Sequence, residues 1–280
     1  MTICIAVKVH DCLVFVTDSA SSMVSTDAAG NQVVMRVYDS GHKLFNLIRG
    51  KPISAMTCGL GNFGNSSIST ITKEIRQEIA MGGAGIDPED YTIEQVANYA
   101  YGRFNALFAA LPDPVRAASS FTFFVGGYST AGAGSELWKM QITGAASLAP
   151  QLIADQNTCK IEWDGQPDAC VRLVLGISPQ TMNILTQAGI DAADALILTQ
   201  KLAQSSQAQL LESSMPVQDA IDLARFLAET TVSFVRFLPG ANTVGGDLDV
   251  ATVTKFEGFR WISRKHYYPM GLNAETNHGA

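Results

Sequence analysis

Hydrophobic and polar positions follow two different periods along the chain, which predicts strands and helices in separate blocks. Residues 2–9 are rich in β-branched side chains that suit a strand, and residues 13–18 form the expected returning strand of a hairpin. With a two-residue turn Ile3 lies opposite Asp18, whereas with a three-residue turn Thr2 does. Either register brings the Asp18 carboxylate within one residue of Thr2.

The block pattern continues to the end of the chain. Residues 19–31 are small and polar and suit an exposed loop, and no element is assigned to residues 145–170. Two helices are expected in the first half: one over 68–81 with Ser66 or Ser67 at its N-cap, and one over 92–111 that a Thr92–Gln95 capping box opens and Pro112 stops. The expected strands are 33–38, a hairpin over 43–56, strands over 121–125 and 137–141 with a turn or bulge at Gly126-Gly127 between them, a short buried strand over 171–175 and a closing hairpin over 248–263. Three further helices are expected over 179–187, 191–211 and 217–237.

This order predicts an α+β fold in which antiparallel sheets are covered by helices, because long helices alternate with blocks of hairpins and not with single strands. No internal repeat, low-complexity tract or Pro/Ser-rich linker divides the sequence. Residues 1–280 are therefore interpreted as a single domain, with a frayed tail after about residue 268.

Composition excludes several function classes. A hydrophobic fraction of 47%, a charged fraction of 16% and a net charge of −7 are typical of a globular protein. Nucleic acid is not an expected partner, because the net charge is −7 and the sequence has no Lys/Arg-rich run. No membrane span is expected either, since no stretch of about eighteen apolar residues occurs. Together with the absence of a basic leader before the apolar start, this predicts a cytoplasmic location.

Cysteine and histidine usage gives no sign of a metal or a cofactor. The five cysteines have irregular spacing and no C-x-x-C pair, which favours buried free thiols in a reducing compartment. The four histidines, at positions 10, 42, 266 and 278, show no metal-ligand spacing. Residues 59–64 match the dinucleotide motif G-x-G-x-x-G, but the surrounding hairpins lack the βαβ rhythm that this site requires. We expect no metal and no cofactor.

The strongest chemical signal is Thr2. If Met1 is removed, Thr2 carries a hydroxyl nucleophile and a free α-amine on one residue, and the amine can act as the base. A serine hydrolase is not indicated, because there is no G-x-S-x-G.

Several motifs resemble the proteasome β-type subunits and HslV, within the N-terminal nucleophile hydrolases. They are Thr2-Ile3-Cys4-Ile5-Ala6-Val7-Lys8, Leu13-Val14-Phe15-Val16-Thr17-Asp18-Ser19, Lys43-Leu44-Phe45-Asn46-Leu47, Ile53-Ser54-Ala55-Met56-Thr57-Cys58-Gly59 and the run from Val244-Gly245-Gly246-Asp247 to Thr254. Residues 121–140 are similar to the family's middle hairpin, whereas residues 145–240 match it mainly in their helix pattern. The Met-Thr start with Asp-Ser after the second strand is most similar to the bacterial proteasome-like Anbu proteins.

The resemblance implies a fold and a set of catalytic roles. The fold is a four-layer αββα sandwich of two antiparallel sheets, with the active site at one end. Thr2 would be the nucleophile and its α-amine the base, Lys43 would lower the pKa of that amine, and Asp18 would hold Lys43 charged and oriented. The backbone N–H of Gly59 would bind the oxyanion.

The resemblance also implies partners. Ser22 and Gly61 match positions where the family clamps its peptide or protein substrate as an added strand. Homo-oligomers, as rings or shallow spirals, are expected, and an ATP-dependent unfoldase partner stays open.

Other positions depart from the family pattern. The family's arginine two residues after the aspartate is Ala20 here, and the segment between Asp18 and Lys43 is longer than usual. The family's late aspartate and serine have no clean match, although Asn242 and Ser178 lie in the corresponding regions. Because the set is incomplete, two alternatives stay open: a proteasome-fold scaffold or assembly protein without turnover, and an amidase acting on a small molecule.

Overall fold

The computed structural model describes residues 2–26, 32–240 and 242–265. Its strands are β1 (Ile3–Lys8), β2 (Cys12–Thr17), β3 (Ser21–Thr26), β4 (Gln32–Tyr38), β5 (Leu44–Phe45), β6 (Ile53–Gly59), β7 (Asn62–Phe63), β8 (Ser66–Ser67), β9 (Ser120–Tyr128), β10 (Ser135–Thr143), β11 (Ser147–Ala154), β12 (Lys160–Gly165), β13 (Asp249–Thr254) and β14 (Gly258–Ser263). Its helices are α1 (Ile68–Ala80), α2 (Ile93–Ala109), α3 (Asp113–Ala118), α4 (Asp168–Cys170), the π-helix η1 (Val171–Leu175), α5 (Thr181–Gln187), α6 (Ala192–Ser206) and α7 (Val217–Arg236).

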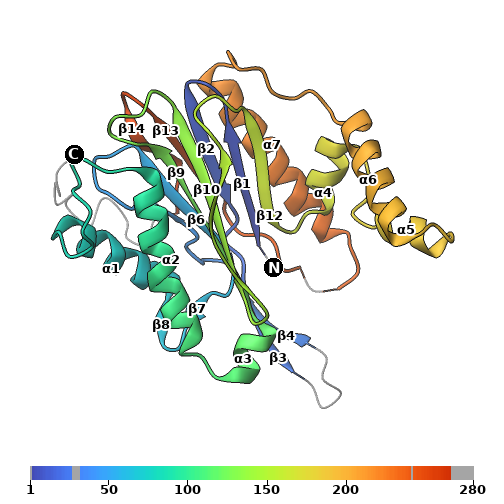
Figure 1. Cartoon of the computed structure of the whole chain (residues 1–280). Coiled ribbons are helices and arrows are strands. Elements are labelled where there is room, and N and C mark those ends of the chain that lie inside the picture. The colour runs from blue at the N-terminus through green and yellow to red at the C-terminus, as the bar shows by residue number, and fades with distance from the viewer. Residues whose placement is uncertain (1, 27–31, 241, 266–280) are drawn as a thin grey trace.

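Two five-stranded antiparallel sheets form the centre of the described chain. The first sheet has the order β12-β1-β2-β13-β14, and the second has the order β11-β10-β9-β6-β5. The sheets stack face to face, with α1 and α2 outside the second sheet and α7 outside the first (Figure 1). The predicted α+β class with antiparallel sheets and flanking helices is confirmed.

Alternate side chains of a strand point to opposite faces of its sheet, which explains how the sheets and helices pack in layers. In β1, Ile3, Ile5 and Val7 pack with α7, whereas Cys4 and Ala6 face the second sheet. A third apolar cluster joins the second sheet to α1 and α2. Every residue of β1 and β2 is buried, which explains why their sequences are apolar on both faces apart from Lys8 and Thr17 at the strand ends.

Many predicted elements are confirmed with small shifts of their ends. Ser67 is the N-cap of α1 and accepts a hydrogen bond from the Thr70 N–H. Thr92 and Gln95 form the predicted capping box at the start of α2. The strand over 33–38, the hairpins over 43–56 and 248–263 and the helix over 217–237 also match described elements.

Three local predictions were wrong, and one stretch had no prediction. The stretch 19–31 is not simply a loop, because Ser21–Thr26 pairs with β4 as the hairpin strand β3. Gly126 and Gly127 do not end a strand; β9 continues through them, and a Cβ on Gly127 would lie 2.1 Å from the Pro52 carbonyl oxygen of the neighbouring segment. Residues 171–175 are helical and not a strand, since they continue α4. Residues 145–170, left unassigned, include the edge strands β11 and β12.

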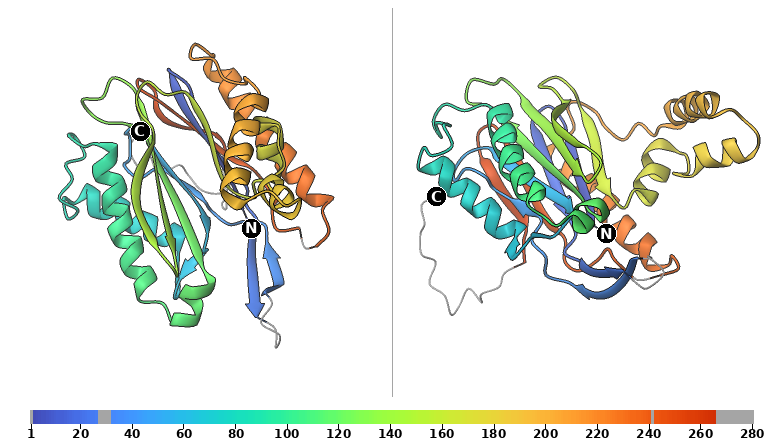
Figure 2. Two further views of the ribbon diagram at one scale, coloured as in Figure 1. Left: turned by 45° about the vertical axis from the view of Figure 1, so that its right-hand side comes forward. Right: turned by 60° about the horizontal axis from the view of Figure 1, so that its bottom comes forward.

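Two parts of the fold stand away from the sandwich (Figure 2). The β3–β4 hairpin projects from one end, and the helices α5 and α6 form an arm beyond α4 and η1. No helix in the described ranges is long and apolar enough to cross a membrane. All five cysteines are free thiols, as predicted, and only Cys159 is not buried. The tail after residue 268 lies outside the described residues.

Candidate active site

The opening hairpin adopts the register of the two-residue turn. The Val9 N–H donates to the Cys12 carbonyl across the turn, at 3.0 Å, and Cys4 pairs with Thr17. Continuation of this register sets Ile3 opposite Asp18, whose N–H donates to the Ile3 carbonyl at 3.3 Å. The hairpin thus returns Asp18 to the start of the strand that Thr2 precedes.

The Asp18 carboxylate is fully buried and accepts four hydrogen bonds. The Ile3 N–H and Lys43 Nζ donate to Oδ1, at 3.1 Å and 2.6 Å, and the Ala20 and Gly245 N–H groups donate to Oδ2, at 3.2 Å and 3.1 Å. A buried carboxylate needs such partners because desolvation otherwise penalises its charge. The carboxylate therefore links the start of β1, the end of β2 and the segment before β13.

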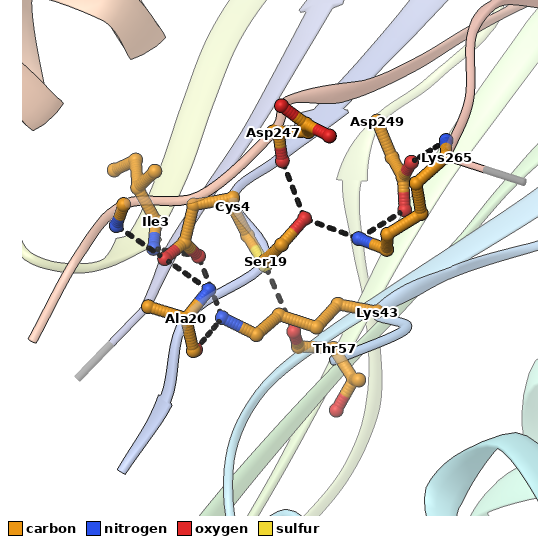
Figure 3. Close-up of polar contacts among 11 residues, drawn as sticks. Ile3, Cys4, Ser19, Ala20, Lys43, Thr57, Asp247, Asp249 and Lys265 are labelled. Atoms are coloured by element: carbon orange, nitrogen blue, oxygen red, sulfur yellow. Dashed lines mark hydrogen bonds and ion pairs between the residues drawn. The ribbon is translucent and has the colours of Figure 1, made fainter. Parts of the chain in front are cut away.

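Lys43 is the ionic partner of Asp18, and its side chain is 9% exposed. Its Nζ also donates to the Ala20 carbonyl (Figure 3). The backbone holds Lys43 in place, because the Thr57 N–H of β6 donates to the Lys43 carbonyl at 2.9 Å. The long segment between Asp18 and Lys43 does not separate the two residues, since its extra length forms the projecting β3–β4 hairpin.

Gly245 and Gly246 pack against the backbone of the segment that follows Asp18. The Gly245 carbonyl accepts hydrogen bonds from the N–H groups of Ser19 and Ala20, at 3.0 Å and 2.9 Å. Gly246 follows with a φ of 71°, and a Cβ there would lie 3.0 Å from the Ser19 Cβ. Glycine is therefore suited to this close approach of two chain segments.

Thr2 lies at the start of β1 and is buried, with 6% exposure. Its carbonyl accepts a hydrogen bond from the Gln166 N–H at 2.9 Å, which ties it to the end of β12. Gly165 permits this contact, because a Cβ on it would lie 1.9 Å from the Thr2 carbonyl oxygen. The backbone of Thr2 is thus fixed on one side by β12 while its neighbour Ile3 bonds to Asp18.

Gly59 lies at the same end of the two facing sheets as Thr2. The Cys4 thiol of β1 donates to the Thr57 carbonyl of β6 at 3.0 Å. Thr2 is two residues before Cys4 and Gly59 is two residues after Thr57, so both continue toward one end of the sandwich. Gly59 has a φ of 95° and ends β6.

Cys4 is the nearest thiol along β1, but its environment opposes nucleophilic chemistry. Burial, and next a hydrogen bond with Cys58, raises the pKa of the Cys4 thiol well above its ordinary value of 9.0. The sulfur therefore stays protonated near neutral pH and acts as a hydrogen-bond donor to the Thr57 carbonyl. Thr2 has no competing thiolate from Cys4.

The predicted substrate-binding residues lie on the β3 side of the site. Ser22 is half-buried in β3, and within the described ranges its buried hydroxyl oxygen has no hydrogen-bond partner. Gly61 is exposed, and a Cβ on it would lie 3.5 Å from the Ser21 hydroxyl oxygen. Gly61 and the start of β3 are therefore neighbours, whereas none of the hydrogen bonds or ion pairs within the described ranges joins Ser22 to Asp18 or Lys43.

A second polar cluster supports the same segment from the C-terminal side. The Ser19 hydroxyl donates to the Asp247 carbonyl, and Lys265 Nζ contacts both the Ser19 oxygen and the Asp249 carboxylate, the latter at 2.9 Å (Figure 3). His42 Nδ1 lies 3.9 Å from the same carboxylate. Burial, and next the Lys265 charge, lowers the pKa of His42. This cluster ties the end of β14 to the residue that follows Asp18.

The positions considered for the family's late aspartate and serine have different surroundings. Ser178 lies just before α5, and its hydroxyl bonds the Gln180 side chain in an exposed local contact. Asn242 lies near the glycine pair, with Nδ2 3.8 Å from the position of a Cβ on Gly245. Among the described residues, no group of three or more His, Cys, Asp or Glu side chains is arranged to hold a metal ion.

The family resemblance implied the Asp18–Lys43 pair, but several of its supports were missed. Gly245 was noted only as part of a motif, although its N–H and carbonyl bond to the segment that holds Asp18. Lys265 was missed completely, since a single lysine after a strand carries no distinctive signal. No family model matches the chain, and a search of curated proteins finds no match either.

Proposed function

We propose that this chain is a threonine-type N-terminal nucleophile hydrolase with a proteasome-subunit-like αββα fold, which cleaves amide bonds of peptides. The observation that carries the proposal is the buried Asp18–Lys43 pair, joined at 2.6 Å, beside the strand that Thr2 precedes. A buried ion pair is weak evidence for stability alone. The hydrogen bond of Asp18 to Ile3, the residue that follows Thr2, supports a chemical role.

In the proposed mechanism, loss of Met1 leaves Thr2 with a free α-amine. An unperturbed α-amine has a pKa of about 8, and the positive charge of Lys43 lowers it toward neutral pH. The neutral amine takes the proton of the Thr2 hydroxyl, directly or through a water molecule, while the hydroxyl oxygen attacks the substrate carbonyl. Asp18 keeps Lys43 oriented through the 2.6 Å contact.

The tetrahedral intermediate then collapses to an acyl-threonine ester. The Gly59 N–H donates to the oxyanion, and one such donor typically contributes about 3 kcal/mol. The protonated amine gives its proton to the leaving nitrogen, which departs as an amine, and water hydrolyses the ester to restore Thr2. Ser22 and Gly61 line the route by which a peptide is added as a strand beside β3.

The proposal extends to the setting of the reaction. The free cysteines support a reducing compartment, and we assign the protein to the cytoplasm. A homo-oligomer that encloses the site limits access to peptides and unfolded chains. No metal or cofactor has a role in these steps.

The test is turnover of short fluorogenic peptides by the purified protein and by a Thr2→Ala variant, with Thr2→Ser as the matched control. Loss of the nucleophile is expected to lower kcat by a factor of about 10³ or more, whereas serine retains a hydroxyl and part of the rate. Equal turnover by Thr2→Ala and the unchanged protein would exclude Thr2 as the nucleophile.

One alternative has an observation in its favour. Thr2 is only 6% exposed, and the family's arginine is replaced by Ala20, which together favour a proteasome-fold scaffold without turnover. Intact mass separates the two readings. Retention of Met1 leaves Thr2 without a free amine and supports the scaffold.

A further inference from the structure

Helix α6 exposes several large apolar side chains that no other described element covers. Of its fifteen residues only Ala195 is buried. Four large apolar side chains are exposed: Leu196 by 45%, Ile197 by 48%, Leu198 by 39% and Leu202 by 44%. A helix with apolar residues on most sides is normally covered by other elements, and contiguous exposed apolar surface marks an interaction site.

The fold leaves this surface open. The α5–α6 arm stands away from the two sheets (Figure 2). It is joined to the rest of the chain at the C-terminal end of α6, where the Ala208 N–H donates to the Val174 carbonyl at 2.9 Å. A Cβ on Gly176 would lie 2.7 Å from Ser206 at the same place, so this end of α6 is packed closely against η1. Helix α5 packs against α6, but the large apolar side chains in the middle of α6 stay exposed and can meet a partner.

One face of α6 has a symmetric order of charge and apolar residues. Asp194, Ile197, Leu198 and Lys201 follow the spacing i, i+3, i+4, i+7 and therefore share one side of the helix, which we name the α6 stripe. All four side chains are exposed. Within the described ranges, neither Asp194 nor Lys201 takes part in an ion pair.

We propose that the α6 stripe is a docking surface for the α6 stripe of a second copy of this chain, packed antiparallel around a twofold axis. An axis between Ile197 and Leu198 places each of these residues against the other in the partner. The same axis brings Asp194 of each copy next to Lys201 of the other. A twofold interface uses one patch twice, so each favourable contact occurs twice.

The order of Asp194 and Lys201 along the stripe favours a second α6 stripe as the partner and an antiparallel orientation of the two helices. Two α6 helices packed parallel and in register would set Asp194 against Asp194 and Lys201 against Lys201, which is repulsive. The antiparallel arrangement replaces both repulsions with attractions and covers the apolar centre of the stripe. The inference does not depend on the proposed hydrolase activity, because no residue of the candidate active site lies in α6.

The experiment measures the mass of the full chain in solution, by sedimentation velocity over a series of concentrations. It compares the unchanged protein with Asp194→Lys, Lys201→Asp and the swapped double variant Asp194→Lys/Lys201→Asp. Lys73→Asp is the matched control, because it makes the same charge change on the exposed side of α1. Circular dichroism of each variant tests whether the fold is retained.

We expect the unchanged protein and Lys73→Asp to associate, beginning with a dimer of twice the 29.9 kDa chain mass. Each single α6 variant sets like charges together twice and is expected to weaken this association by about tenfold or more. The swapped variant restores opposite charges at both places and is expected to associate like the unchanged protein. A monomer at all concentrations, single variants that associate normally, or a swapped variant that fails to recover would each overturn the proposal.

Discussion

The Asp18–Lys43 pair predicts an asymmetry between two substitutions that remove one charge each. Asp18→Asn leaves the Lys43 ammonium buried without a negative partner, with only neutral oxygens such as the Ala20 carbonyl to accept from it. Lys43→Met leaves Asp18 with three backbone N–H donors, from Ile3, Ala20 and Gly245. Asp18→Asn is therefore expected to destabilise the protein more.

The hydrogen bonds of Asp18 indicate how much unfolding free energy each substitution costs. Each carboxylate oxygen of Asp18 accepts from two donors, so the amide nitrogen of an asparagine faces two donors in either orientation of its side chain. Breaking a buried ion pair from one side costs about 3–5 kcal/mol, and we assign Asp18→Asn to this range. Lys43→Met loses the two hydrogen bonds of Nζ, to Asp18 and to the Ala20 carbonyl, but it leaves Asp18 with three N–H donors and keeps much of the apolar packing, for a cost of about 1.5–3 kcal/mol.

The assay is equilibrium unfolding in urea, with the free energy of unfolding compared at one pH. Lys51→Met is the control, because the Lys51–Glu89 pair has the same 2.6 Å separation but the Glu89 side chain is 78% exposed. An exposed pair contributes about 0–1 kcal/mol. The reasoning is refuted if Asp18→Asn costs no more than Lys51→Met, or if Lys43→Met costs more than Asp18→Asn.

Two further predictions concern Gly59 and His42. Gly59→Ala is expected to lower the unfolding free energy by well over the roughly 1 kcal/mol expected for the control Gly64→Ala. Both glycines have a positive φ, but only at Gly59 would a Cβ meet the backbone, 2.2 Å from the Ser120 carbonyl oxygen. Equal thermal stability of the two variants would contradict this. The pKa of His42 is lowered from its ordinary value of 6.5, so the unfolded chain binds this proton first and the His42 contribution to stability is lost as pH falls below that value. His42→Asn should therefore show a smaller loss of unfolding free energy between about pH 7 and pH 5 than the unchanged protein, and parallel pH profiles would remove His42 as a cause.

Local sequence signals predicted the parts of the fold that depend on near neighbours. The Thr92–Gln95 capping box and the Ser67 cap were readable because their partners lie three residues apart. The hairpin register was reduced to two choices because β1 and β2 are joined by a short turn. Asp18 and Lys43 were chosen as partners through the family resemblance, and the 2.6 Å contact agrees with that choice.

The remaining features depend on contacts that distant segments make. Gly126-Gly127 was predicted as a turn or bulge. In the structure both glycines lie inside β9, and Gly127 lets the backbone of the segment before β6 approach closely. Residues 171–175 are apolar enough for a buried strand, and only their continuation from α4 makes them helical. The support that Lys265 gives Ser19 joins residues from opposite ends of the chain, and no local pattern signals it.

The most direct test of the proposed activity is to treat the purified protein with a peptide epoxyketone and to map the adduct by mass spectrometry. This electrophile forms its stable product with a hydroxyl and a free amine on the same residue, so it reports both features that the mechanism requires of Thr2. We expect loss of Met1 and a single adduct on Thr2, with no adduct on the Thr2→Ala variant. A retained Met1 without an adduct, or an adduct at another residue, would contradict the mechanism.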